Sequence, residues 1–440
     1  MTTIIFNAEI VTTSEIFRGY VVINNEIIEK VGEGIPDTGL INSCIERIDL
    51  GGDMLMAGVI DTHVHFRDPG LTHKGDMQSE SKAGIAGGVT SIIDMPNTKP
   101  QTTDFSNVEF KKNIADKKSW ANYGFFIGAT NDNANELIKG NYSECAGVKV
   151  FLGSSTGNMC VNDTEIISLL AEKLPEDVPM AFHAEDEEII KRNIEIVKKD
   201  SKDLPIDLHP EIRSREACLK SAAVVKNIAQ SSGRKCVLLH LSTKEEILLC
   251  SGIENLFLET CPQYLMFDCS DYLKKGSRIK CNPAIKERED KESLQDSLKD
   301  IISVISTDHA PHLMEEKIGN VLEASSGMPG IQFSLRLLLS VTDPKTVTKL
   351  MSANQARIYG ISKRGEIKPG YFADLIRIKY KPSVIKDAEV ISKCGWTPYN
   401  NMTVNHEVVT TWVNGKPVFD NGVFNPANRC PLPLRFCRQS

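Results

Sequence analysis

The sequence predicts an α/β protein, a (β/α)8 TIM-like barrel with a small β domain that the N- and C-terminal segments build together. Two observations predict this fold. From residue 55 to 362 short apolar runs alternate with stretches of helical period, and the segments before and after that region are β-like. Apolar runs that are each followed by a helix are typical of a parallel sheet. We therefore assign 55–362 to the barrel, and 1–54 with 363–440 to the small domain.

Eight apolar runs are the predicted barrel strands. In chain order they are GVIDTHVHF, VTSIIDM, YGFFIGA, GVKVFL, PMAFHA, CVLLHL, LFLETC and SVISTDHA. Segments of helical period lie between them, such as TEIISLLAEKL and REACLKSAAVVKNIAQ. Catalytic groups of such barrels gather at the carboxyl ends of the strands. Polar residues at these ends are therefore the candidates for a site.

The flanking segments carry hairpin signals. TIIFNAEIV and YVVINNEIIEKVG precede the barrel, with Asn24–Asn25 as the predicted turn. EVVTTWVNGKPVF and DNGVF follow it, and Asn421–Gly422 in the second of these is a strong hairpin signal. We expect the two ends of the chain to meet in one sheet.

Composition and charge exclude several classes of protein. The 440 residues are 41% hydrophobic and 25% charged, the profile of a globular protein. A net charge of −7 argues against nucleic-acid binding. No apolar run approaches the ~18 residues that would cross a membrane, and the N-terminal segment lacks the pattern of a signal peptide.

The cysteines indicate a reducing compartment. Twelve are scattered without a CxxC pair, and we expect free thiols in a cytoplasmic protein. Cys261, beside a predicted strand end, is the thiol whose solvent access is worth checking.

The stretch DTHVHFRDPG at residues 61–70 is the first candidate for chemistry. On a strand, His63 and His65 point to the same face, as two ligands of a metal would. Arg67 follows on their side, and arginine is the side chain best suited to hold a carboxylate by two parallel hydrogen bonds. The stretch therefore predicts a metal centre that faces an anionic substrate.

Further polar residues follow or interrupt the other apolar runs, where they would lie at the same end of the barrel: Asn97, Lys149, His183, His240 and Asp308. A lone histidine in such a run is usually a hydrogen-bonded core residue. Four histidines, a lysine and an aspartate at one barrel mouth instead favour a metal site. His309 should point to the opposite side if its strand continues, and we expect no ligand role for His73, His209 or His406.

With these residues assembled, the chain resembles the amidohydrolase superfamily and, within it, the dihydroorotases. The motifs that carry the resemblance span nearly the whole chain, in the family's order: HVHFRDPG, DMPNTKP, GVKVFLG, AFHAED, LLHLST, KCNPAIKERED and STDHAPH. The resemblance implies two zinc ions per chain, bridged by a hydroxide and by a lysine that carries CO2 as a carbamate.

Carried over residue by residue, the resemblance assigns His63, His65 and Asp308 to one zinc ion. His183 and His240 bind the other, and Lys149, N6-carboxylated, bridges both. Asp308 is also the catalytic residue that accepts and returns a proton. Some relatives use an aspartate in the loop after this strand instead, but here that loop reads GSSTGNM, without a carboxylate.

The resemblance also assigns substrate-binding residues. Arg67, Asn97 and His312 suit a carboxylate, Asn282 in CNPAIK suits a pyrimidine ring, and Gly327 in GMPGIQ lines the same site. The loop at 153–158 contains Ser155 and Thr156 between two glycines, which suits either a mobile lid over the substrate or an ordinary surface loop.

Two departures from the dihydroorotase pattern concern the subfamily. ETCPQYL resembles the hydantoinase and allantoinase form of the seventh strand, and Gln332 stands where the family usually has glutamate.

The activity implied is the reversible cyclisation of N-carbamoyl-L-aspartate to L-dihydroorotate in pyrimidine (UMP) synthesis. An allantoinase or dihydropyrimidinase, or a non-catalytic binding protein, are the alternatives. For partners we expect a homo-oligomer, with a dimer as first guess, and docking with aspartate carbamoyltransferase.

Overall fold

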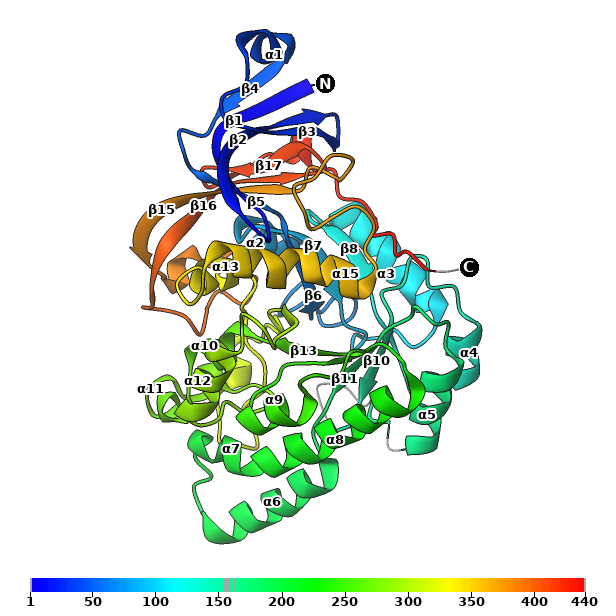
Figure 1. Ribbon diagram of the computed structural model, residues 1–440. Helices are drawn as coiled ribbons and strands as arrows, with labels where there is room; N and C mark the ends of the chain where they lie inside the picture. Colours follow the sequence, from blue (N-terminus) through cyan, green and yellow to red (C-terminus); the bar gives the residue numbers. More distant parts are fainter. Residues whose placement is uncertain (1, 154–158, 162, 439–440) are drawn as a thin grey trace.

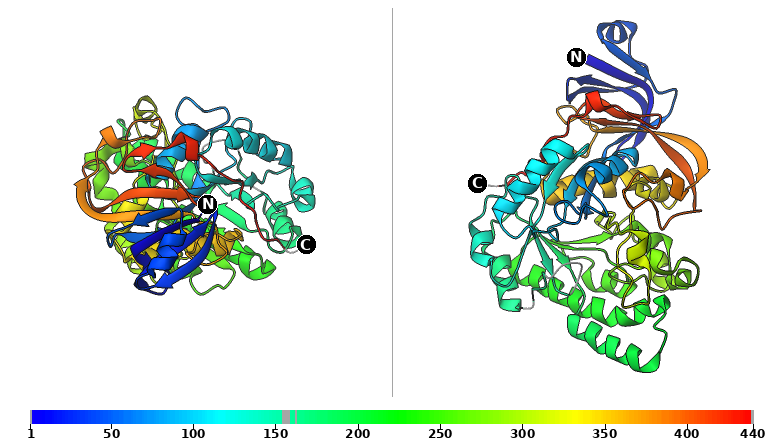
Figure 2. Two further views of the ribbon diagram at one scale, coloured as in Figure 1. Left: turned by 90° about the horizontal axis from the view of Figure 1, so that it is seen from above. Right: turned by 180° about the vertical axis from the view of Figure 1, so that it is seen from behind.

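The structure is a computed structural model that describes residues 2–153, 159–161 and 163–438. A barrel of strands is surrounded by helices, and a twisted β domain packs against one side of it (Figures 1 and 2). The chain enters the barrel from the β domain, passes around the ring and returns to the β domain.

The barrel strands follow one another around the ring. They are β6 (Val59–Val64), β7 (Val89–Asp94), β8 (Asn122–Phe125) with β9 (Ile127–Gly128), β10 (Val148–Phe151), β11 (Met180–His183), β12 (Cys236–Leu238), β13 (Leu256–Thr260) and β14 (Val304–Ile305). Neighbours pair in parallel, in the orders β6-β7-β8 and β9 to β14. The ring closes where Val64 bridges His309 and the His65 N–H donates to the His309 carbonyl at 2.8 Å. The predicted fold class is confirmed.

These strands form because their side chains are buried on both faces. Every residue of β6, β7, β10 and β11 is buried. One group of side chains fills the barrel interior, including Ile60, Ile93 and Val304. The tail of the chain adds Leu434 and Phe436 to that group. Burial on both faces of a strand is what an uninterrupted apolar run predicts.

Helices cover the outside of the ring (Figure 1). They are α2 (Met77–Ala86), α3 (Phe105–Lys118), α4 (Ala134–Lys139), α5 (Thr164–Lys173), α6 (Glu187–Asp200), α7 (His209–Ile212), α8 (Arg215–Ser232), α9 (Lys244–Cys250), α10 (Pro262–Met266), α11 (Tyr272–Lys275), α12 (Arg288–Asp296), α13 (Ser334–Leu338), α14 (Pro344–Thr348) and α15 (Asn354–Tyr359). Local capping sets several ends. Asp76 accepts from the Gln78 and Ser79 N–H groups before α2, and Gly233 ends α8 in a left-handed conformation. No helix in the described ranges is long and apolar enough to cross a bilayer.

The small domain is one sheet made from both ends of the chain. Its elements are β1 (Thr2–Val11), β2 (Ile16–Asn24), β3 (Ile27–Glu33), α1 (Thr38–Ser43), β4 (Glu46–Asp49), β5 (Met54–Ala57), β15 (Leu375–Val384), β16 (Thr403–Val413), β17 (Lys416–Asp420) and β18 (Val423–Phe424). The order is β18-β17-β16-β15-β5-β1-β2-β3, with β4 beside β1. The two ends of the chain meet where β5 pairs with β15. The predicted domain boundary between residues 54 and 55 falls inside β5.

Both predicted hairpins are present, one of them shifted. Asn421 and Gly422 form the turn between β17 and β18, with φ of 48° and 84°. In the first hairpin Asn24 pairs with Ile27, so the turn consists of Asn25 and Glu26 rather than Asn24 and Asn25. Asn25 takes the left-handed conformation, which asparagine adopts readily.

The connection between β15 and β16, residues 385–402, reaches the barrel; we name it the strap. The Trp396 indole N–H donates to the His312 carbonyl at 2.7 Å, and the Tyr399 ring stacks on Phe267. Gln332 holds the strap by donating to the Glu389 carbonyl and accepting from the Ile391 N–H, both at 2.8 Å. A glutamate could not make both bonds when ionised, which explains this departure from the dihydroorotase pattern.

Candidate metal centre

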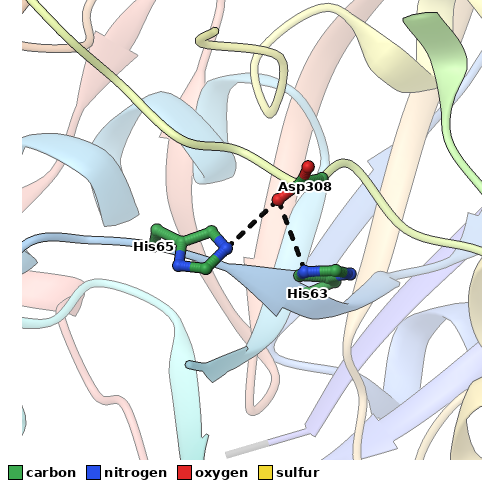
Figure 3. A group of neighbouring side chains, drawn as sticks. All are labelled: His63, His65 and Asp308. Carbon is green, nitrogen blue, oxygen red and sulfur yellow. Dashed lines mark hydrogen bonds and ion pairs between the residues drawn. The ribbon is translucent and has the colours of Figure 1, made fainter. Parts of the chain in front are cut away.

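Three predicted ligands, His63, His65 and Asp308, lie together at the carboxyl end of the barrel (Figure 3). His63 is in β6, His65 follows its end, and Asp308 follows β14. One carboxylate oxygen of Asp308 lies 3.3 Å from Nε2 of His63 and 3.1 Å from Nε2 of His65. All three side chains are buried.

Hydrogen bonds from behind orient both imidazoles. Nδ1 of His63 lies 2.7 Å from the Glu259 carboxylate, and Nδ1 of His65 lies 2.7 Å from the Asn97 amide oxygen. Both oxygens accept, so each Nδ1 carries a hydrogen, and Nε2 of each ring faces Asp308. Burial lowers the pKa of His65 to about 4, so this ring is neutral near pH 7. Its Nε2 lone pair then faces a carboxylate oxygen, an arrangement that needs a cation between the two atoms, so this donor set fits a metal ion.

His183 and His240 form a second pair of donors beside the first group. Nδ1 of His183 lies 2.8 Å from Nε2 of His240, and the His240 ring centroid is 5.5 Å from that of His63. Nε2 of His183 lies 3.3 Å from Glu185. Burial lowers the pKa of both histidines. Two neutral imidazoles with converging nitrogens also fit a metal ion.

Lys149 points into the same space from β10. Its side chain is 1% exposed, and its Nζ lies 4.8 Å from the centre of the Phe151 ring. Burial lowers its pKa to about 7, although Glu259 and Asp308 raise it. No hydrogen-bond acceptor for Nζ occurs among the described residues. A buried lysine without such a partner is out of place in a protein core and calls for a chemical role.

Three residues of the site hold their backbone in the left-handed region: Arg67, His240 and Asp308, with φ of 66°, 43° and 47°. This conformation is costly for residues other than glycine, asparagine or aspartate, and it concentrates at functional sites. It also explains His309, which points away from the ligand group. β14 ends at Ile305, the backbone turns at Asp308, and Nε2 of His309 lies 2.8 Å from the Glu80 carboxylate. The predicted orientation assumed that the strand continues to His309; β14 ends at Ile305, and the turn at Asp308 sets the orientation instead.

Sequence reasoning missed the acidic residues behind the ligands. Glu259 in β13 orients His63, and Glu185 accepts from Arg213 and contacts His183. Both carboxylates are fully buried. Their signal was present in the sequence, since Glu259 interrupts the apolar run LFLET and Glu185 follows the His183 strand directly.

A small cavity adjoins the metal group, and predicted substrate residues line it. The lining residues are His65, Arg67, Asn97, Asn282, Asp308, Ala310, Ser326 and Gly327. Arg67 is 2% exposed; its Nε–H donates to the Pro311 carbonyl at 3.2 Å, and Nη2 lies 3.2 Å from Nε2 of His312. It forms no ion pair within the described part of the chain. Burial lowers its pKa to about 10, so the guanidinium stays charged at neutral pH.

The wall of this cavity requires glycine at residue 327. Gly327 has φ of 130°, and a Cβ there would lie 2.8 Å from the Ala310 carbonyl oxygen. Lys317, almost fully buried, donates to the carbonyls of Ser325 and Gly327 at 2.7 and 2.8 Å. The loop is thus held by its backbone.

The remaining predicted positions fall outside this group. Ser155 and Thr156, predicted as a possible lid, lie outside the described residues. Cys261 is fully buried. His73 is exposed and His406 is partly exposed, and neither is in the ligand group. His209, for which we expected no ligand role, is 3% exposed and is not in the ligand group.

The chain matches the model of the family described as "Amidohydrolase family" over residues 54–418. A dihydroorotase from Methanosphaera stadtmanae is 30% identical over 424 residues, 91% of this chain and 95% of that one. An allantoinase from Streptomyces avermitilis is 28% identical over 411 residues, 90% of this chain and 91% of that one.

Among solved structures, the L-hydantoinase (dihydropyrimidinase) from Arthrobacter aurescens superposes with a TM-score of 0.91 at 22% identity, over 97% of this chain and 98% of that one. At this identity the likeness shows the fold alone. The family match covers most of the chain, and the ligand group that fits a metal ion accords with a family that is typically metal-dependent. The chain belongs to the amidohydrolase family.

Proposed function

We propose that the chain is a dihydroorotase, which reversibly cyclises N-carbamoyl-L-aspartate to L-dihydroorotate. One observation carries the proposal: Arg67 is buried beside the candidate metal ligands without an ion-pair partner among the described residues. A buried charge of this kind is unfavourable unless an anion joins it. Substrate and product both carry a carboxylate. Curated relatives named dihydroorotase, about 30% identical over most of the chain, support the same activity.

We further propose that the site holds two zinc ions. The ligands of one would be His63, His65 and Asp308, and His183 and His240 would bind the other. Lys149 would bridge both as its N6-carboxylated form. Its burial supports this, because the lowered pKa favours the neutral amine, the form that reacts with CO2. When bound, the metals supply a polarised substrate carbonyl and an activated water.

Asp308 is the proposed proton carrier. Although burial raises the pKa of Asp308, that pKa lies below its usual value, so the carboxylate is ionised. In ring opening it accepts a proton from the attacking water and passes it to the departing amide nitrogen; ring closure reverses these transfers.

Arg67 and Asn97 hold the substrate carboxylate at the other side of the cavity. The Asn97 oxygen accepts from His65, so its NH2 group is the end suited to an anion. His312 takes a supporting part: its Nε2 accepts from Arg67, while its Nδ1 lies 3.2 Å from Nζ of Lys74 and 3.4 Å from the Glu316 carboxylate. These contacts use two of the guanidinium N–H groups, and Arg67 also lines the cavity.

A second candidate is an allantoinase or dihydropyrimidinase. The allantoinase relative and the seventh-strand motif ETCPQYL favour it. Allantoin and dihydrouracil lack the carboxylate that Arg67 would bind. The zinc-loaded protein should therefore be assayed with dihydroorotate, allantoin and dihydrouracil. We expect the highest kcat/KM with dihydroorotate, and a higher value with allantoin would overturn the proposal.

Absence of all three activities in zinc-loaded protein would favour a non-catalytic binding protein. A homodimer and docking with aspartate carbamoyltransferase stay predictions. Size-exclusion chromatography of the chain, alone and mixed with that enzyme, would test both.

A further inference from the structure

His209 contacts a residue of the proposed substrate cavity, although it is far from that residue in sequence. It begins α7, and its Nε2 lies 2.8 Å from the Cys281 carbonyl oxygen and 3.2 Å from Oδ1 of Asn282. The ring is buried and meets Tyr272 edge-on, with centroids 6.4 Å apart. Asn282 lines the cavity together with Arg67.

The Cys281 carbonyl fixes the position of the proton on His209. A backbone carbonyl can only accept, so at 2.8 Å the Nε2 atom must carry hydrogen. Burial lowers the pKa of His209 well below its usual value, and Lys280 and Arg213 lower it further. The ring is therefore neutral, with its proton on Nε2.

This proton in turn fixes the amide of Asn282. The atom of Asn282 that faces the His209 N–H must be an acceptor, which is the oxygen and not the nitrogen. The NH2 group then occupies the other end of the amide. It makes no hydrogen bond to the described residues, so its two donors are available to a ligand in the cavity.

We propose that His209 is a positioning residue that makes Asn282 present its NH2 group, rather than its oxygen, to the cavity. The cavity would then select a ligand with two features: an anionic group for Arg67 and a carbonyl oxygen for Asn282. Cyclic ureides that carry a carboxylate have both features. The inference rests on the proposed function, because it takes this cavity as the substrate site.

The first test is independent of activity. Nitrogen-15 spectra of histidine in the whole protein report which ring nitrogen carries the proton, and His209→Gln identifies the signal. We expect neutral His209 with the proton on Nε2 from pH 5 to 9. A proton on Nδ1 would overturn the proposal, whatever the substrate proves to be.

The second test measures binding and turnover in zinc-loaded variants. His209→Leu removes the donor, whereas His209→Gln can supply an amide N–H in its place. Asn282→Asp keeps an acceptor for His209 but has no donor for a ligand. Losing one neutral hydrogen bond weakens binding by roughly 3- to 10-fold. We therefore expect His209→Leu to raise KM, and the Kd of the planar analogue orotate, by this factor with kcat nearly unchanged.

His209→Gln should restore most of this loss, and Asn282→Asp should lose at least as much as His209→Leu. His406→Leu, on the small domain, is the matched control and should leave KM unchanged. If His209→Leu lowers only the melting temperature, or Asn282→Asp binds orotate like the parent, the inference is wrong. If the parent instead turns over another cyclic amide, the proposed function fails, and the same variants are compared on that substrate.

Discussion

Arg67→Met removes the charge at the proposed anion site and keeps the length of the side chain. Of the five N–H donors of a guanidinium, one reaches the Pro311 carbonyl and one His312, which leaves three for a ligand. A carboxylate can take two of these in parallel. Charged hydrogen bonds contribute about 1.5–3 kcal/mol each, so the variant should lose ~3–6 kcal/mol of transition-state binding. That is a loss of roughly 10²- to 10⁴-fold in kcat/KM.

The same substitution should not destabilise the fold. Burial lowers the pKa of Arg67 to about 10, so its surroundings disfavour the charge in the absence of a ligand. We expect an unchanged or higher melting temperature. Dihydroorotate hydrolysis would be followed by ultraviolet absorbance, and any slow hydrolysis of dihydrouracil, which lacks a carboxylate, should be unaffected. Arg67→Lys keeps the charge but not the paired N–H donors of the guanidinium, so its kcat/KM for dihydroorotate should lie between those of the parent and Arg67→Met. A kcat/KM within threefold of the parent, or equal losses on both substrates, would refute the role.

Three further predictions concern the metal ligands and their supports. Lys149→Ala should lower the zinc content from about two ions per chain and abolish activity, with partial rescue by small carboxylic acids; full zinc occupancy would contradict the bridge. In the parent, the rate of ring opening should rise with pH and the rate of ring closure should fall, because closure consumes a proton. The Asp308→Asn variant should be inactive in both directions. Parallel pH profiles, or an active variant, would exclude Asp308 as the proton carrier. Burial raises the pKa of Glu185, but Arg213 and His183 lower it from 4.5 to about 2. The stability that this ionised group contributes, roughly 3 kcal/mol, is therefore present above pH 4.5 and lost as pH falls toward 2. In denaturant unfolding of the metal-free protein, the free energy of unfolding of Glu185→Gln should depend less on pH over that window than that of the parent. An equal pH dependence in both proteins would show that the contacts of Glu185 with Arg213 and His183 contribute little.

The ring of strands could be predicted because each strand is buried on both faces and reads as an apolar run. The candidate ligands could be found for the same reason: His63, Lys149 and His183 are polar residues inside such runs. Their position at one end of the barrel then follows from the parallel arrangement of the strands.

What could not be predicted depends on pairing across long stretches of sequence. Glu259 contacts His63 from 196 residues away, and nothing local selects that partner. The strap has no periodic pattern of apolar residues, so the sequence does not predict the hydrogen bond from its Trp396 to the His312 carbonyl. His209 was missed for a related reason: its partner Asn282 follows another strand of the ring. The turn of the first hairpin lies one residue later than predicted, because Asn24 and Asn25 both suit a turn and the local sequence does not decide between them.

The closure of the ring between its first and last strands determines when the metal group can exist. His65 and Asp308 are 243 residues apart, and the bond that joins the ring, from the His65 N–H to the His309 carbonyl, lies beside them. During synthesis the two histidines leave the ribosome long before the aspartate does. The nascent chain therefore holds two of the three ligands through most of translation. An ion bound by all three residues would then fasten the earliest strand of the ring to the latest, and the arrival of metal would mark the completion of the fold.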